Sequence, residues 1–314
     1  MLAMQIINTL LPVFLMIAVG VFLRKIKFFS DEFVAGLNRL VFWVGLPCLL
    51  FDKIVTAEHS YGVAGKTTLV MIAGTLGSVI LAYIVAFIIR IPPRAVGTFV
   101  QGTFLGNLYY VGLALLMYSF AGADSKTSAR MENVAMLVLA LLVPLHNIAS
   151  IIVLFAGQHK LDRYTPARIA RAAIANPIFL ACVAGIICSY VFPPLPLVIT
   201  RSCEAVGQAS LPLALIGIGA VLAQSKITGS GIPALVASIT KVAVSPIVGF
   251  WAARWIGLGA AETKIALLFL ACPTAVASYV VAEQLGGDEK LSAAIIVVST
   301  ILSIISLSVV IGLF

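Results

Sequence analysis

The fold is decided by the stretch at residues 102–113, which reads GTFLGNLYYVGL. Gly106 and Asn107 fall in the middle of an apolar run that is otherwise long enough to cross a membrane. A second stretch, LACPTAVASY at residues 270–279, places Pro273 in the middle of another such run. Glycine relaxes a helix and proline removes a backbone donor, so we expect both runs to be broken near the bilayer midplane. Because unwound backbone cannot face lipid, paired breaks of this kind indicate a cavity and a substrate site.

The rest of the chain is apolar to a degree that water-soluble proteins do not reach. Of its 314 residues, 61% are hydrophobic and 10% charged, against roughly 45–50% and about 25% in a typical globular domain. The mean hydropathy is +1.14. The apolar runs predict an all-α integral membrane protein with ten transmembrane helices, near residues 4–23, 33–54, 67–89, 95–121, 131–156, 169–191, 196–223, 232–253, 262–284 and 291–313.

Basic residues in the connectors indicate how the chain is oriented in the membrane. The odd-numbered connectors hold Arg24, Lys25, Lys27, Arg90, Arg94, Lys160, Arg163, Arg168, Arg171, Lys226 and Lys290. The even-numbered connectors hold the smaller set Lys53, Lys66, Lys126, Arg130, Arg201, Arg254 and Lys264. Since basic residues concentrate on the cytoplasmic side, we expect a multi-pass protein of the cell membrane with both termini outside.

The sequence also contains an internal repeat. PVFLMIAVGVF at residues 12–22 matches PIFLACVAGII at residues 177–187, an offset of 165 (177 − 12). The same offset relates Pro12 to Pro177, Gly20 to Gly185 and Pro47 to Pro212. Because each copy holds five helices, an odd number, the second copy enters the membrane from the opposite side. We therefore expect inverted halves at residues 1–157 and 169–314, joined by a cytoplasmic connector at 158–168.

Several strings resemble the auxin efflux carrier family, which includes the plant PIN auxin transporters and bacterial malate and malonate carriers. They are NLYYVGLALLMYSFAG from Asn107, CPTAVASYVVAEQLGGDEKLSAAIIVVST from Cys272, LNRLVFWVGLPCLLF from Leu37, NPIFLACVAGI from Asn176 and KVAVSPIVG from Lys241. The long cytoplasmic loop of the plant members is missing, which is typical of the short microbial type.

The resemblance implies that the helices form two domains. Helices 1, 2, 6 and 7 would form a scaffold, through which the protein would form a homodimer. Helices 3–5 and 8–10 would form a transport domain in which helices 4 and 9 cross at the substrate site. Bile-acid sodium symporters and sodium/proton antiporters have similar folds.

The candidate substrate-binding residues lie at the two breaks: Gly106, Asn107, Tyr109, Tyr110, Cys272, Pro273 and Thr274. The amide of Asn107 can donate to a carboxylate and accept from a hydroxyl, and it falls on the family's crossover asparagine. The half-helices that start at the breaks would present free N–H groups to an anion. The two tyrosines either line the cavity or only pack, which is the more common role of aromatic residues in membrane proteins.

Three candidates for charge or coupling lie inside predicted spans: Lys241, His146 and Asn147. A charge at the centre of a span costs at least ~2.5–3.5 kcal/mol, so Lys241 must be compensated. It would attract an anion, take the place of a coupling cation, or only stabilise the transport domain. His146 and Asn147 resemble a family pair that carries the same asparagine. The histidine is either a proton carrier or, as is more common for a lone histidine, makes an interhelical hydrogen bond. Interhelical bonds are also expected from Gln101, Gln208 and Asn176.

These features favour a secondary carrier of a small organic anion, such as a malate-, malonate- or auxin-like carboxylate, working by alternating access. The chain shows no Asp pair within a span, which favours proton coupling or facilitated diffusion over sodium coupling. A channel and an intramembrane enzyme are the alternatives. Neither filter rings nor an acid/base or metal-ligating constellation is visible, so we expect no enzyme activity, no cofactor and no metal. The basic residues form no aromatic-interleaved face for nucleic acid, despite the net charge of +8.

Overall fold

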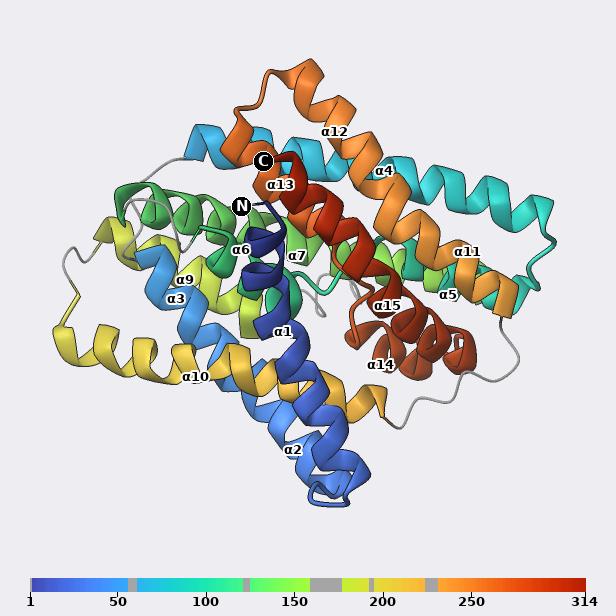
Figure 1. Ribbon diagram of the computed structural model, residues 1–314, viewed down its shortest axis with the longest axis horizontal. Helices are drawn as coiled ribbons and strands as arrows, with labels where there is room; N and C mark the ends of the chain where they lie inside the picture. Colours follow the sequence, from blue (N-terminus) through green and yellow to red (C-terminus); the bar gives the residue numbers. More distant parts are fainter. Residues whose placement is uncertain (1, 56–60, 121–124, 159–176, 192–194, 224–230) are drawn as a thin grey trace.

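The computed structural model describes residues 2–55, 61–120, 125–158, 177–191, 195–223 and 231–314, and within them every named element is a helix (Figure 1). The first half contains α1 (Leu2–Lys25), α2 (Asp31–Leu40), η1 (Val41–Gly45), α3 (Leu46–Val55), α4 (Tyr61–Ile88), α5 (Pro93–Phe104), η2 (Leu108–Gly112), α6 (Leu113–Phe120) and α7 (Ser125–Gln158). The second half contains α9 (Pro177–Val191), α10 (Leu197–Leu222), α11 (Gly231–Ile239), η3 (Thr240–Val244), α12 (Ser245–Ile256), α13 (Ala260–Ala271), α14 (Ala277–Gln284) and α15 (Glu289–Leu313). The segments labelled η are π-helical turns that continue the neighbouring helices.

Seven of the described helices are long and apolar enough to cross a membrane: Ile6–Lys25, Asp31–Val55, Gly62–Ile88, Lys126–Gly157, Leu197–Leu222, Gly231–Ile256 and Glu289–Leu313. Each coincides with a predicted span. Of the other three predicted spans, 95–121 and 262–284 are interrupted, and 169–191 lies partly outside the described residues, as do Asn176 and all but the first residue of the connector expected at 158–168. The chain is therefore an all-helical, multi-pass membrane protein, and the full number of ten spans stays a prediction.

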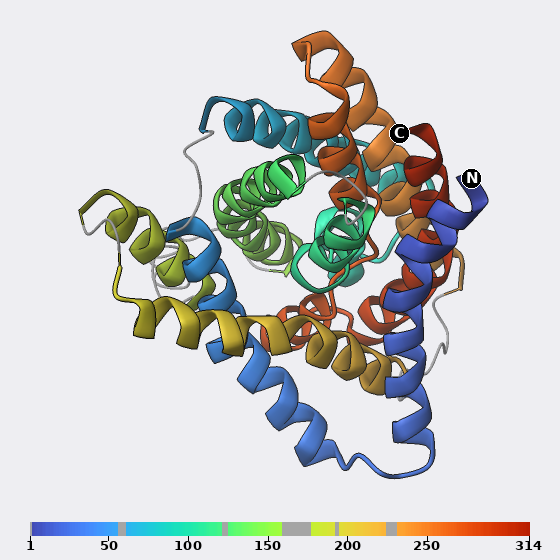
Figure 2. The same cartoon turned by 60° about the vertical axis from the view of Figure 1, so that its left-hand side comes forward.

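The helices pack as two groups. Helix α1 packs along α10, and α3 packs against both α9 and α10. In the other group α4 packs on α12, α11 on α15 and α5 on α7. In Figure 1, α2, α3 and α10 occupy the lower part of the molecule, and α4, α11 and α12 the upper right. Helix α7 runs through the interior of the assembly (Figure 2).

Small residues permit the closest helix contacts. A side chain on Gly20 of α1 would clash with the Ile216 carbonyl of α10, and one on Gly219 of α10 would clash with the Ile17 carbonyl of α1. Inside a membrane, helices associate by close packing because lipid is as apolar as the helix surface. These two glycines therefore set the distance between α1 and α10.

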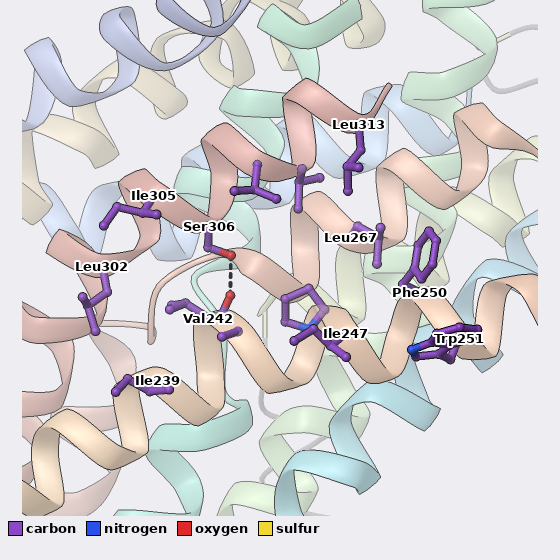
Figure 3. Close-up of a pocket in the computed structure, with 14 residues that line it drawn as sticks. Ile239, Val242, Ile247, Phe250, Trp251, Leu267, Leu302, Ile305, Ser306 and Leu313 are labelled. Carbon is purple, nitrogen blue, oxygen red and sulfur yellow. Dashed lines mark hydrogen bonds between the residues drawn. The ribbon is translucent and has the colours of Figure 1, made fainter.

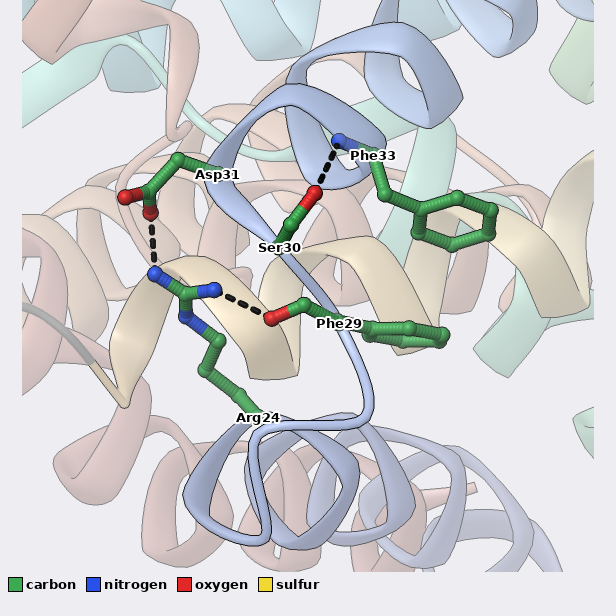
Figure 4. A network of polar contacts seen from close by, with 5 residues as sticks. All are labelled: Arg24, Phe29, Ser30, Asp31 and Phe33. Carbon is green, nitrogen blue, oxygen red and sulfur yellow. Dashed lines mark hydrogen bonds and ion pairs between the residues drawn. The ribbon is translucent and has the colours of Figure 1, made fainter.

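The link between the first two helices is held by polar contacts (Figure 4). The guanidinium of Arg24, in the last turn of α1, donates to the Phe29 carbonyl and to the Asp31 carboxylate. The Ser30 hydroxyl caps α2 by accepting from the Phe33 N–H at 3.2 Å. These contacts fix the angle at which α2 leaves α1.

The helix at residues 231–256 widens in its middle, where η3 carries Lys241. Pro246 has no N–H to offer the Val242 carbonyl four residues earlier, so that carbonyl needs another donor. The Ser306 hydroxyl of α15 donates to it (Figure 3). A proline and an interhelical hydrogen bond thus account for the π-helical turn at this point.

The two interrupted helices meet at their breaks. Helix α5 ends at Phe104 and α13 ends at Ala271. Between them the Asn107 N–H donates to the Pro273 carbonyl at 2.7 Å, and the Ala275 N–H donates to the Leu105 carbonyl at 2.8 Å. The two bonds form an antiparallel bridge centred on Gly106 and Thr274. Each broken segment therefore supplies the backbone partners that the other lacks.

Thr274 connects this crossing to its neighbours through two hydrogen bonds. The Thr274 hydroxyl donates to the Gly102 carbonyl in the last turn of α5 at 2.7 Å. The backbone N–H of Thr274 donates to the Ser299 hydroxyl of α15 at 3.0 Å. A helix C-terminus leaves its last carbonyls without intrahelical donors, so this hydroxyl satisfies a group that water cannot reach.

We predict that Thr274→Val destabilises the protein by about 1–3 kcal/mol, because the buried Gly102 carbonyl loses its donor. Thr68→Val is the matched control: Thr68 is also buried, but its hydroxyl donates at 2.8 Å to Ala64 of its own helix. Thermal unfolding of both variants in detergent measures the difference. Equal losses of stability in the two would contradict the role given to Thr274.

Candidate functional site

Four helix ends converge at the crossing. The C-terminal ends of α5 and α13 arrive there, and the N-terminal ends of η2–α6 and α14 leave from it. Helix N-termini carry partial positive charge and unpaired N–H groups, whereas C-termini carry partial negative charge. The crossing therefore offers donors to an anion and acceptors to a cation within one small region.

Asn107 stands at the start of η2 and is 4% exposed. Its backbone carbonyl accepts from the N–H groups of Val111 and Gly112, at 3.2 and 3.1 Å. Its carboxamide makes no capping hydrogen bond and no side-chain hydrogen bond to any residue that the structure describes. A buried amide that has no protein partner is available to a ligand.

Lys241 lies against the same break and is 1% exposed. Its ammonium donates to the Leu270 carbonyl, in the last turn of α13, at 2.6 Å. A side chain on Gly106 would come within 3.2 Å of the Lys241 Nζ atom, so the absence of one makes room for the ammonium. No carboxylate in the described part of the chain forms an ion pair with it. The helix C-terminus stabilises the charge through its dipole.

Two buried polar pairs join the helices around the crossing. His146 Nε2 of α7 lies 3.0 Å from the Thr75 hydroxyl of α4, and its ring packs edge-on against Phe104. Gln101 of α5 donates through Nε2 to the Ser150 hydroxyl of α7 at 2.6 Å. His146 Nδ1 and Gln101 Oε1 are buried without a hydrogen-bond partner. His146 also lies within electrostatic reach of Lys241.

The structure places the remaining candidates differently. The hydroxyl of Thr274 and the thiol of Cys272 are both taken up by backbone carbonyls, the latter by Leu268 at 3.1 Å. Pro273 contributes its carbonyl to the bridge with Asn107. Of these four residues, Asn107 is the one whose polar side chain makes no hydrogen bond within the described residues. Thr274 and Pro273 connect the two broken segments, whereas the Cys272 thiol bonds back to its own segment.

Tyr109 and Tyr110 are partly buried and pack against the main hydrophobic core. The Tyr109 hydroxyl is buried without a partner, and it lies near Cys182 of α9. Tyr109 thus bridges the two helix groups. Asn147 follows His146 on α7, is partly buried, and makes no side-chain hydrogen bond within the described residues.

Of the two glutamines expected to make interhelical hydrogen bonds, one does and the other does not. Gln101 joins α5 to α7 as predicted. The prediction for Gln208 is wrong: this side chain is exposed and donates at 3.0 Å to Glu204, one turn earlier on the same helix. Four residues along a helix lie on one face, and the local acceptor was the nearer one.

Several partners escaped the sequence-based reasoning. Lys241 finds a main-chain carbonyl, His146 a threonine and Thr274 a serine. Hydroxyl side chains are common in membrane helices, so the sequence did not distinguish Thr75 or Ser299 from other threonines and serines. Every residue has a main-chain carbonyl, so the sequence does not show which carbonyl a lysine contacts. Across the described residues, no group of three or more His, Cys, Asp and Glu side chains is placed to hold a metal ion.

Comparison with known proteins agrees with the resemblance noted in the sequence. The family described as "Membrane transport protein" matches residues 5–159 and 159–311. The chain is 25% identical to a protein of Rhizobium meliloti (strain 1021) named "Putative malonate transporter", over 96% of this chain and 93% of that protein. The chain with this helix crossing therefore belongs to the membrane transport protein family, the auxin efflux carrier family that its crossing segments resemble.

Proposed function

We propose that this protein is a secondary carrier that binds a small organic anion, of the malonate-like dicarboxylate class, at the helix crossing. The observation that carries the proposal is the carboxamide of Asn107, which makes no hydrogen bond within the described residues and directly follows Gly106, the residue against which the buried ammonium of Lys241 lies. Membership of a transport family and the name of the malonate relative support the substrate class.

In this proposal the carboxylate is bound by complementary donors. The Asn107 amide donates one hydrogen bond, and the positive ends of the dipoles of η2–α6 and α14, which both start at the crossing, attract the carboxylate. Lys241 is not displaced from the Leu270 carbonyl and acts as a fixed positive charge. Tyr109 and Tyr110 lie on the side of the site that faces the other helix group, and there they limit how large an anion can bind.

Movement follows from the two helix groups. We assign α1, α2, α3, α9 and α10 to the scaffold and the remaining helices to the transport domain, which carries both breaks. Ten spans in two inverted halves would place the crossing near the bilayer midplane, where rocking of one domain against the other exposes it alternately to each side. The family match divides at residue 159, close to the boundary expected between the halves. We place both termini outside the cell membrane and the dimer contact on the scaffold.

Coupling, in this proposal, uses protons and not sodium. The Lys241 ammonium occupies the Leu270 carbonyl at the crossing, which leaves this oxygen unavailable as a ligand for a sodium ion. His146 takes up the transported proton at Nδ1, which has no hydrogen-bond partner among the described residues, once the bound anion offsets the charge of Lys241. Asn147 is adjacent to His146 on α7. Thr75 keeps the imidazole in place through Nε2.

Uptake by reconstituted protein of radiolabelled mono- and dicarboxylates tests the function and the role of Asn107. We expect uptake and counterflow of a short dicarboxylate, and a loss of about 10–100-fold in Asn107→Ala, since a hydrogen bond to a charged group contributes about 1.5–3 kcal/mol. Asn133→Ala is the matched control and should leave uptake unchanged. Asn133 is on α7, about 20 Å along the helix from His146, which lies beside the crossing. The proposal fails if no carboxylate shows counterflow, and the assignment of Asn107 fails if both variants transport alike.

A second pair of variants tests the fixed charge. Lys241→Gln should raise the KM for the anion by roughly tenfold or more, because the site loses its full positive charge. Lys264→Gln is the matched control: Lys264 is also buried, but its ammonium lies 5.1 Å from the Phe120 ring, at the start of α13. Initial rates over a substrate series separate KM from turnover. An unchanged KM in Lys241→Gln would assign this lysine to stability alone.

His146→Gln tests proton coupling, because glutamine keeps a hydrogen bond to Thr75 but does not titrate near neutral pH. In the wild type, an imposed proton gradient should accelerate uptake and a sodium gradient should not. The variant should still exchange labelled for unlabelled anion without responding to the proton gradient. Acceleration by protons that persists in His146→Gln would contradict the assignment.

A further inference from the structure

An apolar groove of about 560 Å³ lies between the helix at residues 231–256 and α15, with Leu267 of α13 at its base (Figure 3). Its volume falls in the range of sites that bind small molecules, about 300–1,000 Å³. Ser306 is the polar side chain on its wall, and its hydroxyl already donates to the Val242 carbonyl. Apart from Ser306 and the indole N–H of Trp251, the side chains that line the groove are apolar.

The groove opens outward. Trp251 and Ile305 line it from its two flanking helices and are 66% and 67% exposed. Both flanking helices, Gly231–Ile256 and Glu289–Leu313, are long and apolar enough to cross a membrane. In a bilayer, the mouth of such a groove is filled by hydrocarbon and not by water.

One end of the groove carries a positive charge. Arg254 lies in the last turn of α12, and its guanidinium carbon is 5.8 Å from the centre of the Phe250 ring, which lines the groove. Arg254 forms no ion pair with the described residues. Trp255, next to it, is 92% exposed. Exposed tryptophan and arginine at the end of a spanning helix are typical of the headgroup region of the membrane.

We propose that this groove binds an anionic phospholipid, with one acyl chain along its apolar walls and the phosphate on Arg254. A guanidinium binds a phosphate in a bidentate manner, which fixes the headgroup as well as attracting it. No acidic residue lines the groove among the described residues, so the ammonium group of a zwitterionic headgroup has no partner there. The positive charge of Arg254 therefore favours an anionic headgroup, and the apolar walls of the groove bind the acyl chain.

Quenching of tryptophan fluorescence by brominated acyl chains tests the site. The chain has three tryptophans, so W43F/W255F leaves Trp251 in the groove as the reporter. The purified protein is titrated with dibrominated phosphatidylglycerol or dibrominated phosphatidylcholine. We expect half-maximal quenching at roughly fivefold less phosphatidylglycerol, the factor that corresponds to about 1 kcal/mol for one basic residue at an anionic membrane surface.

Adding R254Q to the reporter should remove the preference for phosphatidylglycerol. The matched control is R201Q, which removes an exposed arginine of α10 away from the groove and should keep the preference. Should R254Q not fold, Ala243→Phe serves in its place: it fills the groove from η3 and should likewise reduce quenching by phosphatidylglycerol to the level of phosphatidylcholine.

Three results would overturn the proposal. Equal quenching by the two lipids in the reporter would mean that the groove holds only bulk lipid chains. A preference that survives both R254Q and Ala243→Phe would place the anionic lipid elsewhere. Shielding of Trp251 from both lipids that increases with protein concentration would mean that a second copy of the chain covers the groove.

Discussion

The rest of this structure depends on two backbone hydrogen bonds, from Asn107 to Pro273 and from Ala275 to Leu105. Two broken helices inside a membrane leave N–H and C=O groups that neither water nor lipid can satisfy, and each unpaired group costs about 1–3 kcal/mol. Pairing the breaks with each other removes that cost for both. Neither break is tolerable at membrane depth by itself, so the crossing is a single structural unit.

The crossing also explains how Lys241 can be buried without a carboxylate partner among the residues that the structure describes. The C-terminal end of α13 supplies the Leu270 carbonyl and the negative end of a dipole. Gly106 supplies the space, since any side chain there would contact the ammonium. The π-helical turn that carries Lys241 is in turn held by Ser306 through the Val242 carbonyl. The stabilised charge and the space for it are thus consequences of the same break, whereas the π-helical turn comes from Pro246 and Ser306.

Much of this architecture could be predicted from the sequence, because its causes are local. Apolar runs give helices, and the glycines near Asn107 and the proline at 273 break them where expected. What could not be predicted are the partners. The bond between Asn107 and Pro273 joins residues far apart in the chain, Lys241 is satisfied by a carbonyl, and Gln208 turns to its own helix instead of a neighbour. The first two depend on tertiary packing and on main-chain groups, which no residue pattern records.

An experimental structure determined with saturating malonate tests most directly our proposal that the Asn107 amide at this crossing receives the transported anion. We expect density for a dicarboxylate within hydrogen-bonding distance of the Asn107 carboxamide and next to Lys241, with the backbone bridge at Gly106 and Thr274 intact. Density for the anion at another position, with the Asn107 amide bonded to protein, would contradict it.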